Sequence, residues 1–165
     1  MLTKQEFVVG VLDEFRIINH LFTTIPPGAF EYRPSANQRS TTELLQYLSI
    51  MGLEIVRAIR NGSFAAFGEA EQRAKALRPQ EFPQAMERQA QQIQELLADM
   101  SDGELQESID LFNTGKAAQR RVLLVNWLLK TLGAYKMQLF LYVKASGNPE
   151  IGTPDLWMGA PAPRA

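Results

Sequence analysis

The sequence predicts an all-α protein, an antiparallel four-helix bundle whose last helix is the longest. Three features support this prediction: three helix-capping boxes, four apolar stripes with helical spacing, and a proline-free run over residues 119–146. With 165 residues, of which 45% are hydrophobic and 21% charged, the chain is large enough for one compact core. We therefore expect a single domain over residues 1–165, with a proline-rich tail over residues 148–165.

Capping boxes mark the first two helices. In such a box, a Ser or Thr and a Glu three residues later bond to each other's backbone N–H groups. The boxes at Thr3 and Ser40 predict helices over residues 3–23 and about 40–60, the second ending at the Asn61-Gly62 pair. The intervening segment contains three prolines and is predicted to be a loop.

The middle of the chain is less regular. Residues 69–77 have helical propensity but few apolar anchors, so we expect a connection with one short helix. Pro83 suits a first helical turn, and apolar residues then recur at helical spacing to Met100, which predicts an amphipathic outer helix. A third box at Ser101 begins a short turn, and the corner at residues 113–115 interrupts the helical pattern.

The longest helix is predicted over residues 116–147. Its apolar residues occur on more than one face, which indicates a central position in the bundle. Gly147, followed by Asn148-Pro149, can take a left-handed conformation and end the helix. A narrower polar stripe runs along it, formed by Thr131, Tyr135, Gln138 and Tyr142.

Charge and hydropathy exclude several function classes. The 17 basic and 18 acidic residues give a net charge of −1, so no overall field attracts nucleic acid or an anionic membrane. No uncharged apolar run is long enough to span a membrane, and the first residues lack the pattern of a signal peptide. We expect a cytoplasmic protein that binds neither nucleic acid nor membranes.

The chain offers few groups for metal or nucleophilic chemistry. It contains one histidine and no cysteine. His20 falls on the same helical face as Asp13 and Arg16, so we expect it to be exposed to solvent. Calcium loops, serine-hydrolase motifs and glycine-rich phosphate loops are absent from the sequence. We therefore expect no metal and no cofactor, and no residue can be assigned a catalytic role.

Polar residues on otherwise apolar stripes remain as candidate site residues. Tyr47 and Glu54 lie seven residues apart on nearly the same face of the second helix, and the last helix supplies Thr131, Tyr135 and Gln138. A buried tyrosine hydroxyl needs a hydrogen-bond partner, so these groups can simply bond to one another in the core. Alternatively, they line a pocket between helices, where bundles commonly hold ligands.

Two segments resemble the DinB/YfiT-like superfamily of four-helix bundles, and the likeness extends over about residues 2–159. Residues 39–48, RSTTELLQYL, are similar to the start of the superfamily's second helix, a capped E-L-L-x-H-L. Residues 131–139, TLGAYKMQL, followed by Tyr142 and Gly147, are similar to its H-x-x-x-H-x-x-Q-L stretch and later Y-L-x-x-x-G.

The resemblance implies the bundle, a cavity between these helices and a homodimer. In the superfamily, three histidines of these segments bind a divalent metal that supports thiol transferase or hydrolase chemistry. This sequence has Tyr47, Thr131 and Tyr135 at those positions. Neutral phenol and threonine hydroxyls are poor ligands for zinc or nickel, so the metal site is expected to be lost.

Two hypotheses follow. The first is a metal-free bundle that binds a small ligand or a partner in the pocket between its helices. The second is an enzyme that uses Tyr47, Tyr135 or Glu54, or a metal unlike that of the superfamily.

Overall fold

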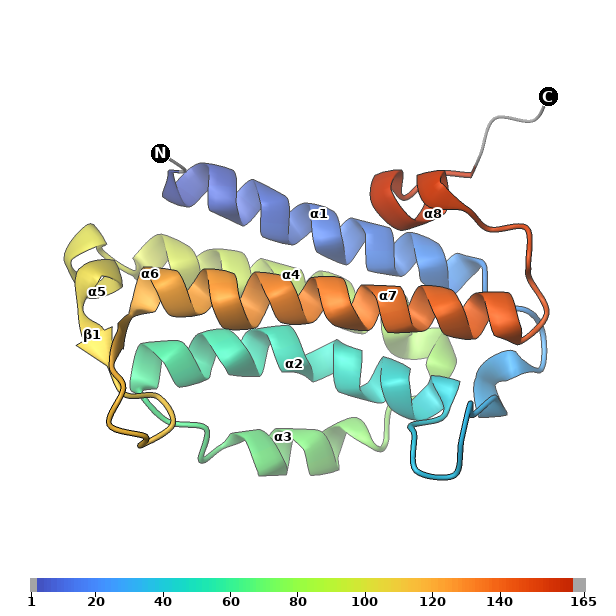
Figure 1. Cartoon of the computed structure of the whole chain (residues 1–165), viewed down its shortest axis with the longest axis horizontal. Coiled ribbons are helices and arrows are strands. Elements are labelled where there is room, and N and C mark those ends of the chain that lie inside the picture. Colours follow the sequence, from blue (N-terminus) through green and yellow to red (C-terminus); the bar gives the residue numbers. More distant parts are fainter. Residues whose placement is uncertain (1–2, 162–165) are drawn as a thin grey trace.

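The computed structural model describes residues 3–161, in which four long helices pack side by side (Figure 1). Residues 162–165 of the predicted tail, and residues 1–2, lie outside the described residues. The bundle helices are α1 (Lys4–Thr23), α2 (Thr41–Asn61), α4 (Phe82–Asp99) and a continuous last helix, composed of α6 (Arg120–Leu123), η3 (Leu124–Leu129) and α7 (Lys130–Ala145). α1 and the last helix run in one direction, and α2 and α4 in the other. The predicted all-α bundle with a long last helix is confirmed.

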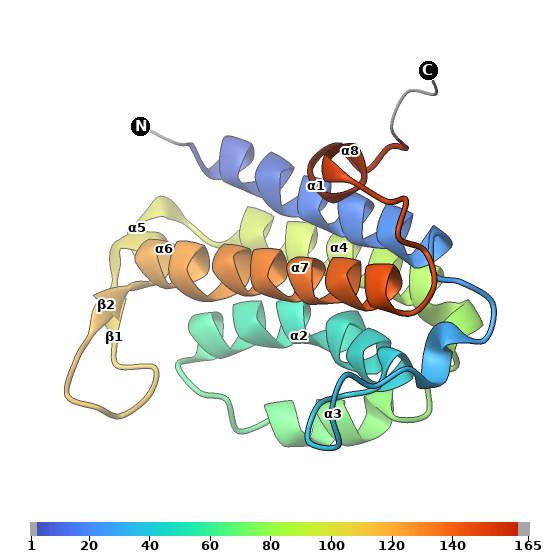
Figure 2. The ribbon, with the colours of Figure 1, turned by 45° about the vertical axis from the view of Figure 1, so that its right-hand side comes forward.

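Shorter elements connect the bundle helices. α3 (Phe67–Ala74) runs along the outside of α2 and returns the chain, so that α4 starts at the same end of the bundle as α2. The remaining short elements are η1 (Ala29–Glu31), η2 (Pro79–Glu81), α5 (Asp102–Gln106) and α8 (Thr153–Met158). β1 (Ser108–Ile109) pairs antiparallel with β2 (Ala118–Gln119), and Figure 2 shows the loop between them at the end of the bundle where α2 ends. Within residues 3–161, every helix is too short or too polar to cross a membrane.

Local signals set the boundaries of these helices. The capping boxes at Thr3, Ser40 and Ser101 are all formed, each hydroxyl accepting the backbone N–H of the glutamate three residues later. α2 ends at Gly62, whose φ of 74° lies in the left-handed region that favours glycine. The predicted bounds of α1 and α2 are therefore confirmed to within one residue.

Three helices approach one another closely at Gly52, midway along α2. The buried Gln89 of α4 accepts a hydrogen bond from the Leu53 N–H through Oε1 and donates one to the Leu48 carbonyl through Nε2, both at 2.9 Å. A Cβ atom at residue 52 would lie 3.0 Å from Gln89 Oε1 and 3.0 Å from Cζ of Phe15 in α1. A larger residue here would force Gln89 or Phe15 to shift, so glycine suits the place where α1, α2 and α4 meet, and α4 is bonded to the backbone of α2.

The last helix differs from its prediction in three respects. It begins at Arg120, because Ala118–Gln119 pairs with β1, and residues 124–129 form a π-helix. Its predicted central position is wrong: α1, α2 and α8 pack against it, and several of its apolar side chains remain exposed. These exposed residues are Val122, Val125, Met137 and Leu141.

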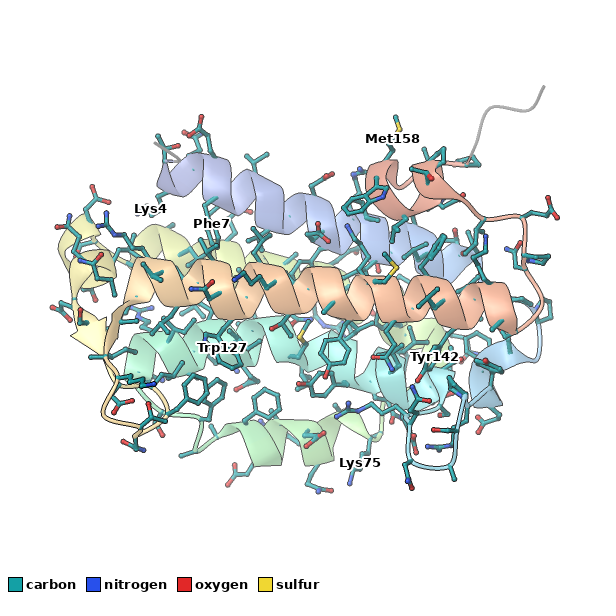
Figure 3. All side chains as sticks on the ribbon, viewed as in Figure 1. Lys4, Phe7, Lys75, Trp127, Tyr142 and Met158 are labelled. Carbon is teal, nitrogen blue, oxygen red and sulfur yellow. The ribbon has the colours of Figure 1, made fainter. Side chains whose placement is uncertain are left out.

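The tail contains a helix, α8, that the sequence did not predict. Ile151 and Leu156 anchor it as buried side chains, whereas Trp157 and Met158 are 60% and 65% exposed. Figure 3 shows the labelled Met158 projecting away from the bundle.

The prediction that His20 is exposed is also wrong, because α8 packs against the last turn of α1. His20 Nε2 lies 2.9 Å from Oδ1 of the buried Asp155, and 18% of its side chain is exposed. Burial disfavours the charged form of Asp155, but hydrogen bonds from the Gly152 N–H and from His20 outweigh that effect and lower the pKa of its carboxyl group.

We predict that Gln89→Leu lowers the free energy of unfolding by about 2 kcal/mol, because it removes two buried hydrogen bonds to the α2 backbone. Urea unfolding followed by circular dichroism measures the change. Gln91→Leu on the exposed face of α4 is the matched control, with an expected change within about 0.5 kcal/mol. Equal effects of the two variants would show that the buried amide contributes no more than a surface residue.

Candidate ligand groove

An open groove with a volume of about 700 Å³ lies between α2, α3 and the last helix. We call it the aromatic groove, because six of its eleven lining residues carry aromatic rings. This volume falls within the usual range for small-molecule sites. The lining residues are Tyr47, Ile55, Phe64, Phe67, Phe112, Asn126, Trp127, Lys130, Thr131, Ala134 and Tyr135.

The six rings form an arc that starts and ends on the last helix. From Tyr135 it passes to Tyr47 of α2, with ring centroids 4.9 Å apart, and then to Phe67 of α3 at 6.1 Å. Phe67 contacts Phe64 at 5.9 Å, Phe64 stacks on Phe112 at 5.6 Å, and Phe112 meets Trp127 at 4.5 Å. In Figure 3, the labelled Trp127 lies on the α3 side of the last helix. The arc therefore joins four segments that are distant in the sequence around one opening.

Tyr47 and Tyr135 form the inner end of this arc. The Arg39 guanidinium lies over the Tyr47 ring, with Cζ 4.1 Å from the centroid, and pairs with Glu71 at 3.4 Å. Burial, together with the neighbouring Tyr135 hydroxyl, raises the pKa of Tyr47 to about 12. At neutral pH the Tyr47 phenol is therefore protonated.

Phe112 reaches the groove on the loop between β1 and β2. The Asp110 carboxylate accepts hydrogen bonds from the backbone N–H groups of Thr114, at 3.0 Å, and Gly115, at 2.6 Å. These bonds lower the pKa of Asp110 and hold the loop in a turn in which Asn113 has a φ of 53°. The turn places an aromatic side chain that is 41% exposed beside Trp127.

The π-helical segment supplies the outer wall. A π-helix has more residues per turn than an α-helix, so it changes the direction of the side chains before it relative to those after it. Asn126 and Trp127 of this segment line the groove together with Lys130 and Thr131 of the next turn. Lys130 Nζ donates to Asn126 Oδ1 at 2.6 Å, which places an ammonium group and an amide at the same edge.

Three of the five predicted site residues meet in this groove. Tyr47, Thr131 and Tyr135 line it, as the helix alignment implied. Glu54 instead lines a separate groove between α2, α3 and α4, where it is buried and pairs with Arg57 at 2.7 Å. Glu54 is therefore not joined to Tyr47, although Ile55, the next residue of α2, lines the aromatic groove.

Gln138 lies outside the groove as well. Its Nε2 donates to the Tyr142 hydroxyl at 2.8 Å, and that hydroxyl donates to the Arg39 carbonyl at 3.0 Å. Figure 3 shows the labelled Tyr142 near the opposite end of the last helix from Trp127. Gln138 therefore helps to join α7 to the start of α2.

Sequence reasoning missed the outer half of the arc. Phe64, Phe67 and Phe112 occur in predicted connections, and Trp127 was counted among the apolar faces of the last helix. The three phenylalanines could have been noticed in the sequence, because each occurs in an otherwise polar or irregular segment. Such residues must either pack on the bundle or line a surface site.

The residues at the expected metal position do not fit a zinc or nickel site. Tyr47, Thr131 and Tyr135 offer two phenols and one aliphatic hydroxyl, and the phenol of Tyr47 keeps its proton at neutral pH. Elsewhere in residues 3–161, no three side chains of His, Cys, Asp or Glu are close enough together to hold a metal ion.

Comparison with known proteins identifies the fold. No protein-family model and no curated protein matches the sequence. Among solved structures, the chain is similar to a DinB-like protein, YjoA, from Bacillus subtilis, with a TM-score of 0.70 and 20% sequence identity. The match covers 90% of this chain and 96% of that one. The chain therefore has a DinB-like fold.

We predict that the Tyr47 phenol makes the free energy of unfolding fall as the pH rises above 9. Tyr47 has a folded-state pKa of about 12, against about 10 in an unfolded chain. The unfolded chain therefore loses its proton first, and the stabilisation is present below about pH 10 and lost as the pH rises towards 12. In urea unfolding between pH 9 and 11.5, Tyr47→Phe should lose less stability than the original chain. Parallel decreases in the two proteins would contradict the burial of this hydroxyl.

Proposed function

We propose that this DinB-like bundle binds a small, mostly apolar ligand in the aromatic groove and does so without a metal. The observation that supports the proposal best is the arc of six rings around an opening of about 700 Å³. Phe112 and Trp127 are each 41% exposed, although either could be buried by a flat molecule placed between the arc and the last helix. Removing such surface from water favours binding.

Binding is better supported than catalysis by Tyr47 and Glu54. A phenol with a pKa of about 12 is protonated at neutral pH, so it can donate a hydrogen bond but is almost never present as the phenolate that would act as a general base. Glu54, the carboxylate considered as its partner, lies in another groove and is paired with Arg57. The hydroxyl groups of Tyr47, Tyr135 and Thr131 are therefore assigned to ligand contacts.

The first test uses a neutral fluorescent ligand, N-phenyl-1-naphthylamine, whose emission rises in apolar sites. We expect saturable binding to the purified protein and about tenfold weaker binding to Trp127→Ala, because that change removes one wall of the groove. Trp157→Ala is the matched control, since Trp157 is an exposed tryptophan on α8 outside the groove, and it should bind as the original chain does. Absence of saturable binding, or equal effects of the two variants, would refute the proposal.

The second test concerns the metal. Elemental analysis of protein purified without chelators should give far less than one zinc or nickel per chain, because the three matching positions offer no imidazole or thiolate. The triple variant Tyr47→His, Thr131→His and Tyr135→His should bind either metal in isothermal titration calorimetry, since these side chains line one groove. A stoichiometric transition metal in the original protein would overturn the metal-free proposal.

A further inference from the structure

The aromatic groove has one charged lining residue, and it is basic. Lys130 is the only charged residue among its eleven lining residues, and none of them is acidic. At the inner end, Arg39 covers the Tyr47 ring from outside the groove and is paired with Glu71 at 3.4 Å. The positive charge that faces the groove without a carboxylate partner is therefore that of Lys130, at the edge beside Trp127.

Lys130 is also free to pair with a ligand. Its ammonium group contacts Asn126 Oδ1 at 2.6 Å, and within residues 3–161 it forms no ion pair with a carboxylate. Because the Asn126 oxygen faces Lys130, the amide NH₂ of Asn126 is a second donor at the same edge. The Thr131 hydroxyl lines the groove next to them. This edge therefore offers donors, one of them charged, beside the exposed ring of Trp127.

We propose that the ligand of the aromatic groove is a flat aromatic molecule that carries an anionic group, such as a carboxylate or sulfonate. The inference rests on the function proposed above and adds the chemical class of the ligand. Its rings lie along the arc between Trp127 and Tyr135, and its anionic group lies at Lys130 and Asn126. The volume of the groove suits two or three fused or linked rings.

A cationic ligand fits these observations less well, although aromatic cages often bind quaternary ammonium groups. In such cages, the faces of the rings are free for the cation. Here the Arg39 guanidinium already covers a face of the Tyr47 ring, and Lys130 would repel a second positive charge in the groove. Lys130 favours an anion instead.

The test compares two dyes that differ by one charged group. 8-Anilinonaphthalene-1-sulfonate carries a sulfonate, and N-phenyl-1-naphthylamine has the same ring system without it. Each is titrated against the original chain and against Lys130→Gln. Arg121→Gln is the control, because Arg121 is an exposed cation of the same helix outside the groove.

We expect Lys130→Gln to weaken binding of the sulfonate about threefold, as for a solvent-exposed ion pair, and to change binding of the neutral dye less than twofold. Arg121→Gln should leave both affinities unchanged. Lys130→Arg should retain the affinity for the sulfonate, and added salt should weaken the sulfonate more than the neutral dye.

The possible failures are distinguishable. If the neutral dye binds and the sulfonate does not, or if Lys130→Gln weakens both dyes equally, the anionic ligand class is wrong and the proposed function survives. If neither dye binds the original chain, the proposed function and the present inference are both overturned.

Discussion

The hydrogen bonds between Gln89 and the backbone of α2 are the constraint on which the rest of the bundle depends. They fix α4 against α2 at the one position where glycine lets three helices approach closely. α2 and α4 run in the same direction, so the chain must travel the length of the bundle between them. α3 and its flanking segments make this return on the outside of α2. The connection therefore brings Phe64 and Phe67 beside Tyr47, where they form the middle of the aromatic arc.

The groove results from the same arrangement. α3 lies outside the four bundle helices and packs mainly against α2. The space between α3 and the last helix is filled at its inner end by the contact of Tyr47 with Tyr135 and is open towards Trp127. The two phenol rings thus occupy part of the space between α2 and the last helix. What remains is an apolar opening with donors at one edge.

Local patterns explain why the helices were predictable and most of the groove was not. A capping box or a glycine stop is encoded within four residues, and the bounds of α1 and α2 followed from such signals. The bond between Gln89 and Leu53 joins residues that are 36 positions apart, and the contact of His20 with Asp155 spans 135 positions. Contacts between residues so far apart leave no periodic pattern in the sequence. The π-helical turn at residues 124–129 contains neither glycine nor proline, so it too left no local signal.

Only the part of the candidate site that lies on two long helices could be predicted from the sequence. Tyr47, Thr131 and Tyr135 were placed together correctly, because each lies on a long helix with a defined register. Glu54 and Gln138 were assigned by helical face alone, and the neighbours of those faces depend on α3 and on the start of α2. The outer wall of the aromatic groove is formed by the loop between β1 and β2 and by the π-helical segment. Their side-chain directions follow from tertiary contacts such as those of Asp110 with its own turn.

Packing against the aromatic rings and pairing with Lys130 would contribute very different free energies to ligand binding. Covering a two-ring molecule would remove on the order of 400 Å² of apolar surface from water, counting both partners, for about 10 kcal/mol. Association opposes this by about 4 kcal/mol or more. An exposed ion pair with Lys130 adds at most about 1 kcal/mol, so the rings supply most of the affinity. A cation at the same place would lose a similar amount, and the difference between the two charges then reaches about 2 kcal/mol, or roughly thirtyfold. In the proposed complex, the arc would therefore select a flat molecule, and Lys130 would select the sign of its charge.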